Sequence, residues 1–412
     1  MGNAPGAAGR RAAGAARARA AGRGAGARCA GARGAGAGAG AGAGTGAGGG
    51  GGAAAAAAAA EPLLDLGEAF HAVLVRRPAE SVRSPYVADI ELTGPAGGAP
   101  FPPGARPRAL AWVPGLDLGG QCSPGARLLV TPAPPQRTPS PKPRRTEYWV
   151  QLVRVDEPEC ADGETWIGAM PNLGTDLARK IIDRGLLPAL AGYPRCRAEV
   201  RGAVAEGSRA DFVLDDPADP GRRSAVVEVK NVVCADYAPA TAPEPTKKRC
   251  VVVGRGEPYE RAGVFPWGSV AQDFEGERVV SARAVKHITE LRRAAEGGRA
   301  RAVLLFVANR RDCRSVRACH EACPVFADEL ERSRAAGVEA LAVRVRWAGG
   351  RAFFDGEVPV AGLPPEGLRD VRALRAARLA GRRAGGRKAQ AARAAPAARA
   401  EAGAAAKRRR LF

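Results

Sequence analysis

Five short stretches between residues 70 and 155 alternate apolar with polar residues, and clusters of glycine and proline separate them. Successive side chains of a strand point to opposite faces of a sheet, so this alternation predicts half-buried β-strands. Their length and spacing indicate a small β-barrel or sandwich, which we place at residues 61–158. The five stretches read AVLVRR, YVADIEL, ALAWV, ARLLVTP and EYWVQLVRV.

Beyond residue 172 the pattern changes to helices that alternate with strands. Residues 173–185, LGTDLARKIIDRG, place their apolar side chains on one helical stripe and end at a glycine. Residues 235–278 contain PATAPEPTKKR, and we expect a surface loop there. The order of elements predicts an α/β domain with a mixed sheet over residues 159–350. Further strands are predicted at 197–205, 209–214, 224–233, 301–308 and 338–346, and further helices at 283–296 and 325–335.

Two neighbouring predicted strands carry charged residues that can meet. Glu228 and Lys230 are two positions apart in VVEVKNV, so their side chains leave the same face of a strand. The intervening DDPADPGRR has the composition of a hairpin loop, which would lay Asp211 of SRADFVL beside Glu228. Two half-buried carboxylates are costly unless a divalent cation lies between them. The alternative is a solvated strand face with an ordinary Glu–Lys pair.

The order of an Asp followed by Glu-x-Lys resembles the PD-(D/E)xK nuclease core. The surrounding text, over about residues 70–347, resembles the sugar fermentation stimulation protein family. This resemblance implies a mixed α+β fold, with an N-terminal OB-like small β-barrel followed by a restriction-endonuclease-like α/β domain in which residues 235–278 are an insertion. It also implies DNA binding without marked sequence preference. The segments that carry the resemblance are GYPRCRAEVRGAVAEGSRADFVL, VVEVKNV, VSARAVKHITEL, RAVLLFVANRRD and GVEALAVRVRW.

With this resemblance, the charged residues become candidates for metal-assisted phosphodiester cleavage. Asp211 and Glu228 would be ligands of Mg²⁺ or Mn²⁺, and Lys230 would stabilise the attacking hydroxide or the charge of the transition state. Glu199 stands where family members also carry a Glu on the first strand. It is a candidate third ligand, with an exposed strand acid as the alternative.

Three further residues are candidates for the nucleic-acid contact. Lys286 and His287 match the family's Lys-His pair at the start of a helix, and only one of two neighbours can face the site. We expect Lys286 to contact phosphate and His287 to be a partly buried histidine. Arg209 precedes the carboxylate strand and could clamp a phosphate with its planar guanidinium.

The cysteines of CRSVRACHEAC, at residues 313–323, suggest a zinc site at first sight. Their spacings fit no common structural zinc pattern, so we expect ordinary thiols. The chain has nine cysteines spread along its length, which favours a reducing compartment over a disulfide scaffold.

The positive charge is concentrated at the two ends of the chain. Of the formal net charge of +21, residues 1–60 contribute +7 and residues 371–412 contribute +12, which leaves +2 for the residues between them. Net charge therefore does not show a basic face on the folded part. Residues 1–60 are predicted to be a disordered low-complexity tail and residues 351–412 a basic tail, partly helical or disordered.

The N-terminal tail also bears on localisation. It is rich in arginine and free of acids, as transit peptides to chloroplast or mitochondrion are, with compositional drift as the alternative. No apolar run approaches the ~18–20 residues of a membrane span, so no membrane partner is expected. We expect an intracellular protein, organellar if the tail is a transit peptide and otherwise cytoplasmic or nuclear.

Three functions fit these observations. The first is a DNA-binding protein with a Mg²⁺-dependent nuclease site, and the second is a non-catalytic DNA-binding or regulatory protein on a nuclease-like scaffold. The third, an RNA-associated factor, depends only on the Arg- and Gly-rich tails. The sequence leaves catalytic activity, natural substrate and oligomeric state open.

Overall fold

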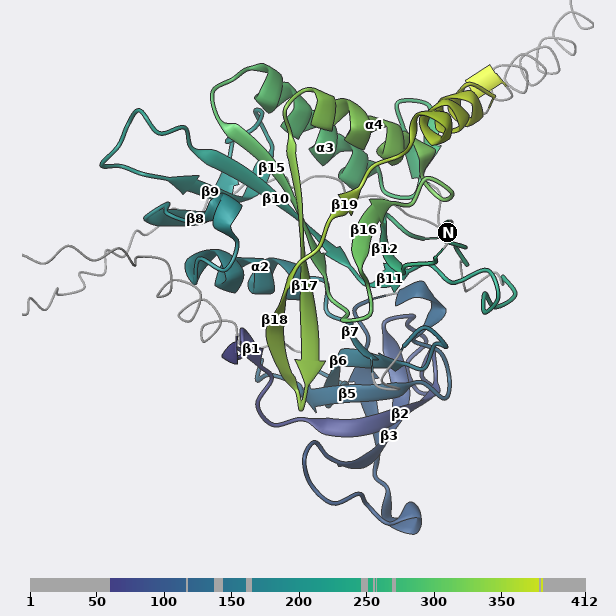
Figure 1. Cartoon of the computed structure of the whole chain (residues 1–412). Coiled ribbons are helices and arrows are strands. Elements are labelled where there is room, and N and C mark those ends of the chain that lie inside the picture. The colour runs from purple at the N-terminus through teal and green to yellow at the C-terminus, as the bar shows by residue number, and fades with distance from the viewer. Residues whose placement is uncertain are drawn as a thin grey trace, which may run out of the picture. The chain divides into compact units, whose positions relative to one another are not determined.

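The computed structural model describes residues 60–380, with gaps at 116–117, 137–143, 161–164, 246–250, 255, 257, 269–271 and 378 (Figure 1). These residues fall within one structural unit that spans Gly49–Phe412. The low-complexity N-terminal tail, to which the transit-peptide hypothesis applies, lies outside the described part of the chain. The last 32 residues lie outside it as well. None of the helices in that part has an apolar stretch long enough to cross a bilayer.

The N-terminal domain is the predicted small β-barrel. Neighbouring strands pair antiparallel, and a parallel pairing of β4 with β6 closes a ring of five strands. A short strand, β7 (Thr165–Gly168), extends the sheet beyond β6. The ring consists of β2 (Phe70–Arg76), β3 (Val87–Pro95), β4 (Arg108–Trp112), β5 (Arg127–Pro132) and β6 (Tyr148–Val155), with the 3-10 turns η1 (Pro103–Ala105) and η2 (Leu118–Gly120) between strands.

Alternation along the strands separates the inside of the barrel from the outside. Leu74, Leu128 and Val153 are fully buried and belong to the apolar cluster that fills the barrel. Their neighbours Leu129 and Leu152 point outward and pack into the core of the following α/β domain. Both faces of the barrel wall are therefore apolar on this side, which joins the two domains.

The second domain is built on a seven-stranded mixed sheet. Its central strands β10, β15 and β17 are parallel, and β8, β9 and β10 form an antiparallel meander. The parallel centre of the sheet is buried on both faces, which explains why the sequence of β15 is almost continuously apolar. The sheet order is β1 (Leu64–Asp65), β18 (Arg351–Glu357), β17 (Glu339–Ala348), β15 (Arg301–Ala308), β10 (Ala225–Val232), β9 (Arg209–Asp215) and β8 (Arg195–Arg201).

Helices cover both faces of this sheet (Figure 1). α2 (Leu173–Asp183) packs its apolar stripe on one face, in the cluster that also receives Leu129 and Leu152 from the barrel. α3 (Ala282–Glu296) and α4 (Pro324–Ala335) cover the opposite face. Each matches its predicted range closely. A 3-10 turn, η3 (Pro188–Leu190), follows α2.

Residues 235–278 are not simply a surface loop. Ala262 and Val264 of β12 are buried, and β12 is the second strand of a small sheet. The apolar run is only four residues long and its partners are distant in sequence, so periodicity does not show it. The small sheet has the order β11 (Cys234–Ala235), β12 (Ala262–Phe265), β16 (Ser315–Ala318) and β19 (Val360–Ala361), and β13 (Gln272–Phe274) pairs with β14 (Glu277–Val279) in a hairpin.

The C-terminal tail begins later than the sequence suggests. Residues 351–361, assigned to the basic tail, form β18 and β19. β18 follows β17 through a turn at Gly349 and Gly350, which adopt φ of +55° and +75°. Two consecutive positive φ values are the mark of a tight hairpin turn and favour glycine. A helix follows over 365–377.

A buried ionic network joins three parts of the chain. Arg310, which follows β15, is 1% exposed and donates from Nη2 to Glu157 Oε2 at 2.8 Å and to Asp312 Oδ2 at 2.6 Å. Glu157 follows β6 of the barrel. Arg261, immediately before β12, pairs with Glu157 and lies 2.9 Å from Asp312. The network thus ties the barrel, the segment 235–278 and the main sheet together.

The charges in this network compensate one another. Burial opposes ionisation of Glu157, but the charges of Arg310 and Arg261 outweigh it and hold the pKa of this carboxyl below its usual value. The same balance, led by Arg310, lowers the pKa of Asp312 strongly. Removing one buried partner would leave an uncompensated charge, which is the expensive case.

We predict that Arg310→Ala destabilises the protein by roughly 3–5 kcal/mol, because both Glu157 and Asp312 lose a buried counter-ion. Urea unfolding of the full chain measures the change. Arg351→Ala, which removes an exposed partner of Asp65, is the matched control and should leave the midpoint almost unchanged. Equal midpoints for the two variants would contradict the structural role of the network.

Candidate functional site

The structure brings Asp211, Glu228 and Lys230 together on one face of the main sheet. Val213 of β9 and Val226 of β10 are a register pair on the face covered by α3. Asp211 is two positions from the first, and Glu228 and Lys230 are two and four positions from the second, so all three share that face. The interactions that Asp211 makes with the charges of Glu228 and Lys230 agree with this placement.

The pairing of β9 with β10 ends beside the carboxylates. Its register runs from Ala225–Leu214 to Val227–Phe212 and does not continue to Asp211. Instead, the Asp211 side chain accepts the backbone N–H of Val229 through Oδ2 at 2.7 Å. A side chain therefore takes the place of a ladder bond, which holds one oxygen of Asp211 in position.

Glu228 and Lys230 are buried charges that satisfy each other. They are 6% and 8% exposed, and Lys230 Nζ donates to Glu228 Oε1 at 2.5 Å. His287 Nδ1 contacts the same carboxylate oxygen. Burial opposes ionisation of Glu228, but these two partners outweigh it and lower its pKa. The carboxylate is thus held ionised in an apolar setting.

The pKa of Asp211 is shifted in the opposite direction, above its usual value. Burial, and then the neighbouring charge of Glu228, raise its pKa, although the Val229 N–H and Lys230 act against the rise. Two carboxylates this close repel each other when both are ionised. Hard carboxylate oxygens are the donors that Mg²⁺ and Mn²⁺ prefer, so this pair fits a divalent cation chemically.

Glu199 lies at the rim of the carboxylate pair. On β8 it falls between Ala198 and Val200, which pair with Phe212 and Ala210, so it is positioned across from Asp211. Its side chain is 50% exposed, and its charge contributes to the raised pKa of Asp211.

The rim also carries a cation and a backbone irregularity. Arg209 Nε lies 2.6 Å from Glu199 Oε2, and its side chain is 51% exposed. Glu199 itself adopts a positive φ of 56°. Glu199 is therefore an exposed acid that is paired with Arg209, as the alternative interpretation expects. Among the described residues, Glu199, Asp211 and Glu228 do not place three ligand atoms within 4.8 Å of one another.

On α3, His287 rather than Lys286 faces the carboxylates. The buried residues Ala284, Ile288 and Leu291 mark the inner side of the helix, and His287 is three or four positions from two of them. Lys286 points away, is 58% exposed and lies 3.7 Å from Glu290. The expectation that Lys286 faces the site is therefore wrong, and the apolar stripe could have predicted the correct phase.

A second group of possible metal ligands was not foreseen from the sequence. In the described part of the chain, Glu157, Cys160 and Asp312 place one ligand atom each within 4.8 Å of one another. Arg261 and Arg310 already compensate both carboxylates. Burial, followed by the charge of Asp312, raises the pKa of the Cys160 thiol, which disfavours the thiolate that a metal needs. We assign this group to the ionic network.

The CRSVRACHEAC cysteines behave as buried thiols. Cys313, Cys319 and Cys323 are fully buried. Burial raises the pKa of Cys313 well above its usual value. No grouping of these residues with metal-ligand proximity occurs among the described residues.

Comparison with known proteins identifies the chain. The model of the sugar fermentation stimulation protein RE domain matches residues 172–250 and 279–350, which contain Asp211, Glu228, Lys230 and His287. A homolog from Maricaulis maris is 34% identical over 206 residues, 50% of this chain and 68% of its own length. One from Thioalkalivibrio sulfidiphilus is 30% identical over 239 residues, 57% and 77% of the two chains.

Among solved structures, Pyrococcus furiosus SfsA in complex with Ca²⁺ covers 73% of this chain and 100% of its own, with a TM-score of 0.48 and 19% identity. The family model spans both segments that flank residues 251–278. On these matches, the chain belongs to the sugar fermentation stimulation protein family.

Proposed function

We propose that the protein binds DNA and that its α/β domain hydrolyses phosphodiester bonds with Mg²⁺ or Mn²⁺. The observation that carries the proposal is the like-charge pair of Asp211 and Glu228, held on one face beside the buried cation of Lys230. A protein that buries two neighbouring carboxylates accepts a cost in stability, which a bound cation would remove.

Asp211 and Glu228 would hold the cation, with Glu199 at the rim as a further ligand. When bound, the ion polarises a phosphate oxygen and lowers the pKa of a coordinated water. Lys230 and His287 take one oxygen of Glu228, and the Val229 N–H takes one oxygen of Asp211. These bonds orient both carboxylates before any substrate arrives.

Lys230 is the residue suited to stabilise developing negative charge. Its ammonium is 8% exposed and is held against Glu228, so its position is fixed by a bond within the protein. A fixed charge in a site with little water stabilises a transition state more than a mobile surface lysine does. His287 orients Glu228 from α3 and is a positioning residue in this scheme.

DNA binding would come from cations around the site and from the tails. Arg209 is exposed at the rim of the carboxylate pair, and Lys286 is exposed on the outer side of α3. The two ends of the chain add most of the net positive charge. Contacts of this kind neutralise phosphates without reading bases, so binding should weaken steeply with salt.

One observation favours a second function, that of a non-catalytic DNA-binding protein. Lys230 and His287 both contact the same oxygen of Glu228, which protein groups therefore satisfy. A nuclease-like fold can persist as a scaffold after its chemistry is lost. This function predicts salt-sensitive binding that is independent of metal and leaves the DNA intact.

Asp211→Ala and Lys230→Ala should each lower the cleavage rate by about 100-fold or more, because Asp211 would hold the cation and Lys230 would stabilise negative charge at the reacting phosphate. Supercoiled plasmid and single-stranded circular DNA, incubated with the full chain and Mg²⁺ or Mn²⁺, provide the assay. Asp183→Ala and Lys180→Ala on α2 remove the same residue types from the other side of the sheet and should cleave normally. Mutants at 211 and 230 that cleave as fast as wild type would refute the nuclease proposal.

Mg²⁺ or Ca²⁺ should raise the melting temperature of the wild-type chain, because an ion that binds only the folded state stabilises it. At a hundredfold excess over Kd the gain is about 2.7 kcal/mol. Asp211→Ala should lose the gain and Asp183→Ala should keep it, as measured by differential scanning fluorimetry against EDTA. Equal shifts in the two variants would place the ion elsewhere.

In EDTA at neutral pH, Asp211→Asn should be more stable than wild type by up to about 1 kcal/mol. Its neutral amide removes the repulsion from Glu228 and can still accept the Val229 N–H. Since the pKa of Asp211 is raised on folding, the cost of its ionised form is present at high pH and absent below the ordinary value of 3.8. The gain should therefore disappear in acid, and urea titrations at several pH values test this. A destabilised Asp211→Asn at neutral pH would contradict it.

A further inference from the structure

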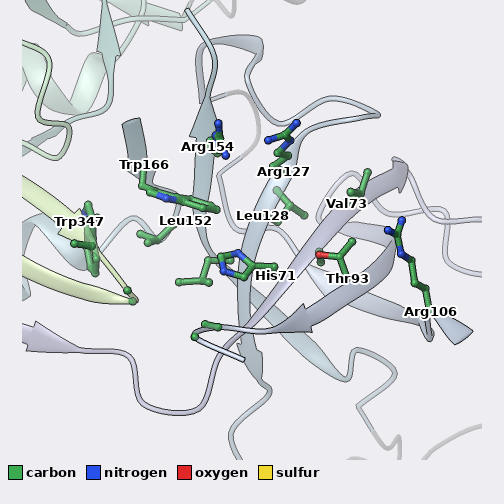
Figure 2. A pocket seen from close by; sticks show the side chains of 17 residues that line it. His71, Val73, Thr93, Arg106, Arg127, Leu128, Leu152, Arg154, Trp166 and Trp347 are labelled. Carbon is green, nitrogen blue, oxygen red and sulfur yellow. The ribbon is translucent and has the colours of Figure 1, made fainter. Parts of the chain in front are cut away.

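A pocket of about 530 Å³ lies on the outside of the barrel, where the barrel meets the turn between β17 and β18 (Figure 2). Its volume is in the range of small-ligand sites, roughly 300–1,000 Å³. We call it the barrel pocket. It is lined by outward residues of β2, β5, β6 and β7 and by the end of β17 with its glycine turn.

Strand register explains why these side chains converge. Arg127 of β5 pairs with Val73 of β2, and Arg154 of β6 pairs with Trp166 of β7. His71 is two positions from Val73 and therefore leaves the same face. This is the outer face, because the intervening residues fill the barrel interior. The pocket is thus a regular consequence of alternation, in which four strands present their polar and aromatic positions to one space.

The charge of the barrel pocket has one sign. Among the described residues, Arg106, Arg127 and Arg154 line it and no acid does, although Arg154 also pairs through Nε with Asp156, which is not part of the lining, at 2.9 Å. Arg106 donates to Glu91 through Nη1 at 3.4 Å, but its Nε is buried and has no hydrogen-bond partner among the residues that the structure describes. Arg127 is exposed. A buried donor without an acceptor is costly.

The same pocket presents aromatic rings. His71 and Trp166 have ring centroids 5.8 Å apart at an interplanar angle of 36°. Trp347 adds a third ring from β17, and Figure 2 shows Trp166 and His71 among the arginines of the lining. Rings beside guanidinium groups suit a planar ligand that carries phosphate, since bases stack on aromatic faces and arginine binds phosphate oxygens.

We propose that the barrel pocket binds an unpaired nucleotide of a nucleic acid strand, with its base against Trp166 and its phosphates at Arg127 and Arg154. The choice of a strand among planar anions rests on the proposed function. The pocket itself is separate from the carboxylate site: it uses the outer barrel wall and the β17–β18 turn, whereas Asp211 and Glu228 lie under α3. A double helix hides its bases within the stack, so the pocket selects single-stranded segments.

The test is fluorescence anisotropy of the full chain with a labelled oligothymidylate of about 12 nucleotides, in EDTA to prevent cleavage. Trp166→Ala should weaken binding roughly tenfold, and Trp166→Phe, which keeps a stacking face, should stay within about threefold of wild type. Removing both Arg127 and Arg154 should lower the slope of log affinity against log salt by about 1.4.

Matched variants separate the pocket from general charge and from folding. Arg108→Ala removes an exposed arginine of β4 that lines a different hollow with Glu80 and Asp89, and should leave affinity unchanged. Arg127 is exposed, so Arg127→Ala tests the pocket without disturbing packing even if Trp166→Ala unfolds. The tails are identical in every variant, so their contribution cancels at each salt concentration.

Four results would overturn the proposal. In the first two, Trp166→Ala binds with the affinity of wild type, or Arg127→Ala and Arg108→Ala lose equal affinity. In the other two, a blunt duplex binds more tightly than the single strand, or polyglutamate displaces the labelled strand as effectively as oligothymidylate does. Equally effective displacement by thymidine monophosphate at the same nucleotide concentration would show that the pocket binds a free nucleotide and not a nucleic acid strand. The assay contains EDTA and measures binding alone, so a failure of cleavage leaves this result interpretable.

Discussion

The guanidinium of Arg310 is the point at which the separate parts of this molecule are joined. It is enclosed by carboxylates from the barrel and from the segment that follows β15, and Arg261 brings in the segment before β12. Such a group cannot be buried unless all of its partners are present together. The docking of the barrel on the α/β domain is therefore specified by charge as well as by the apolar contact through Leu129 and Leu152.

Two buried ionic clusters in this fold show opposite balances. Around Arg310 the opposite charges alternate, and both carboxyl pKa values are lowered. At Asp211 and Glu228 two like charges adjoin, and one pKa is raised. The first arrangement stabilises the fold, and the second leaves it with an unresolved repulsion. Electrostatic compensation thus distinguishes a structural cluster from a candidate functional one where composition alone does not.

Much of the fold follows from alternation and helical stripes. The barrel strands and the helices could be predicted because each is long enough to show its period, and β15 because its apolar run is continuous. The two-residue strands β11 and β19 could not, since their partners are far away in sequence. Likewise, Asp211, Glu228 and Lys230 could be grouped from spacing, and the apolar stripe of α3 indicates that His287 faces inward. Arg310, in contrast, reads as an ordinary surface charge at a strand end.

The segment 235–278 has a consequence for how this chain could change. It contributes Arg261, one of the two cations that share the acids beside the barrel. Replacing it with a short connection would leave those acids with a single counter-ion and would remove β12 from the small sheet. A segment that looks like a dispensable insertion is therefore required for the fold. A variant with a shorter segment would need other residues to compensate the charges of those acids.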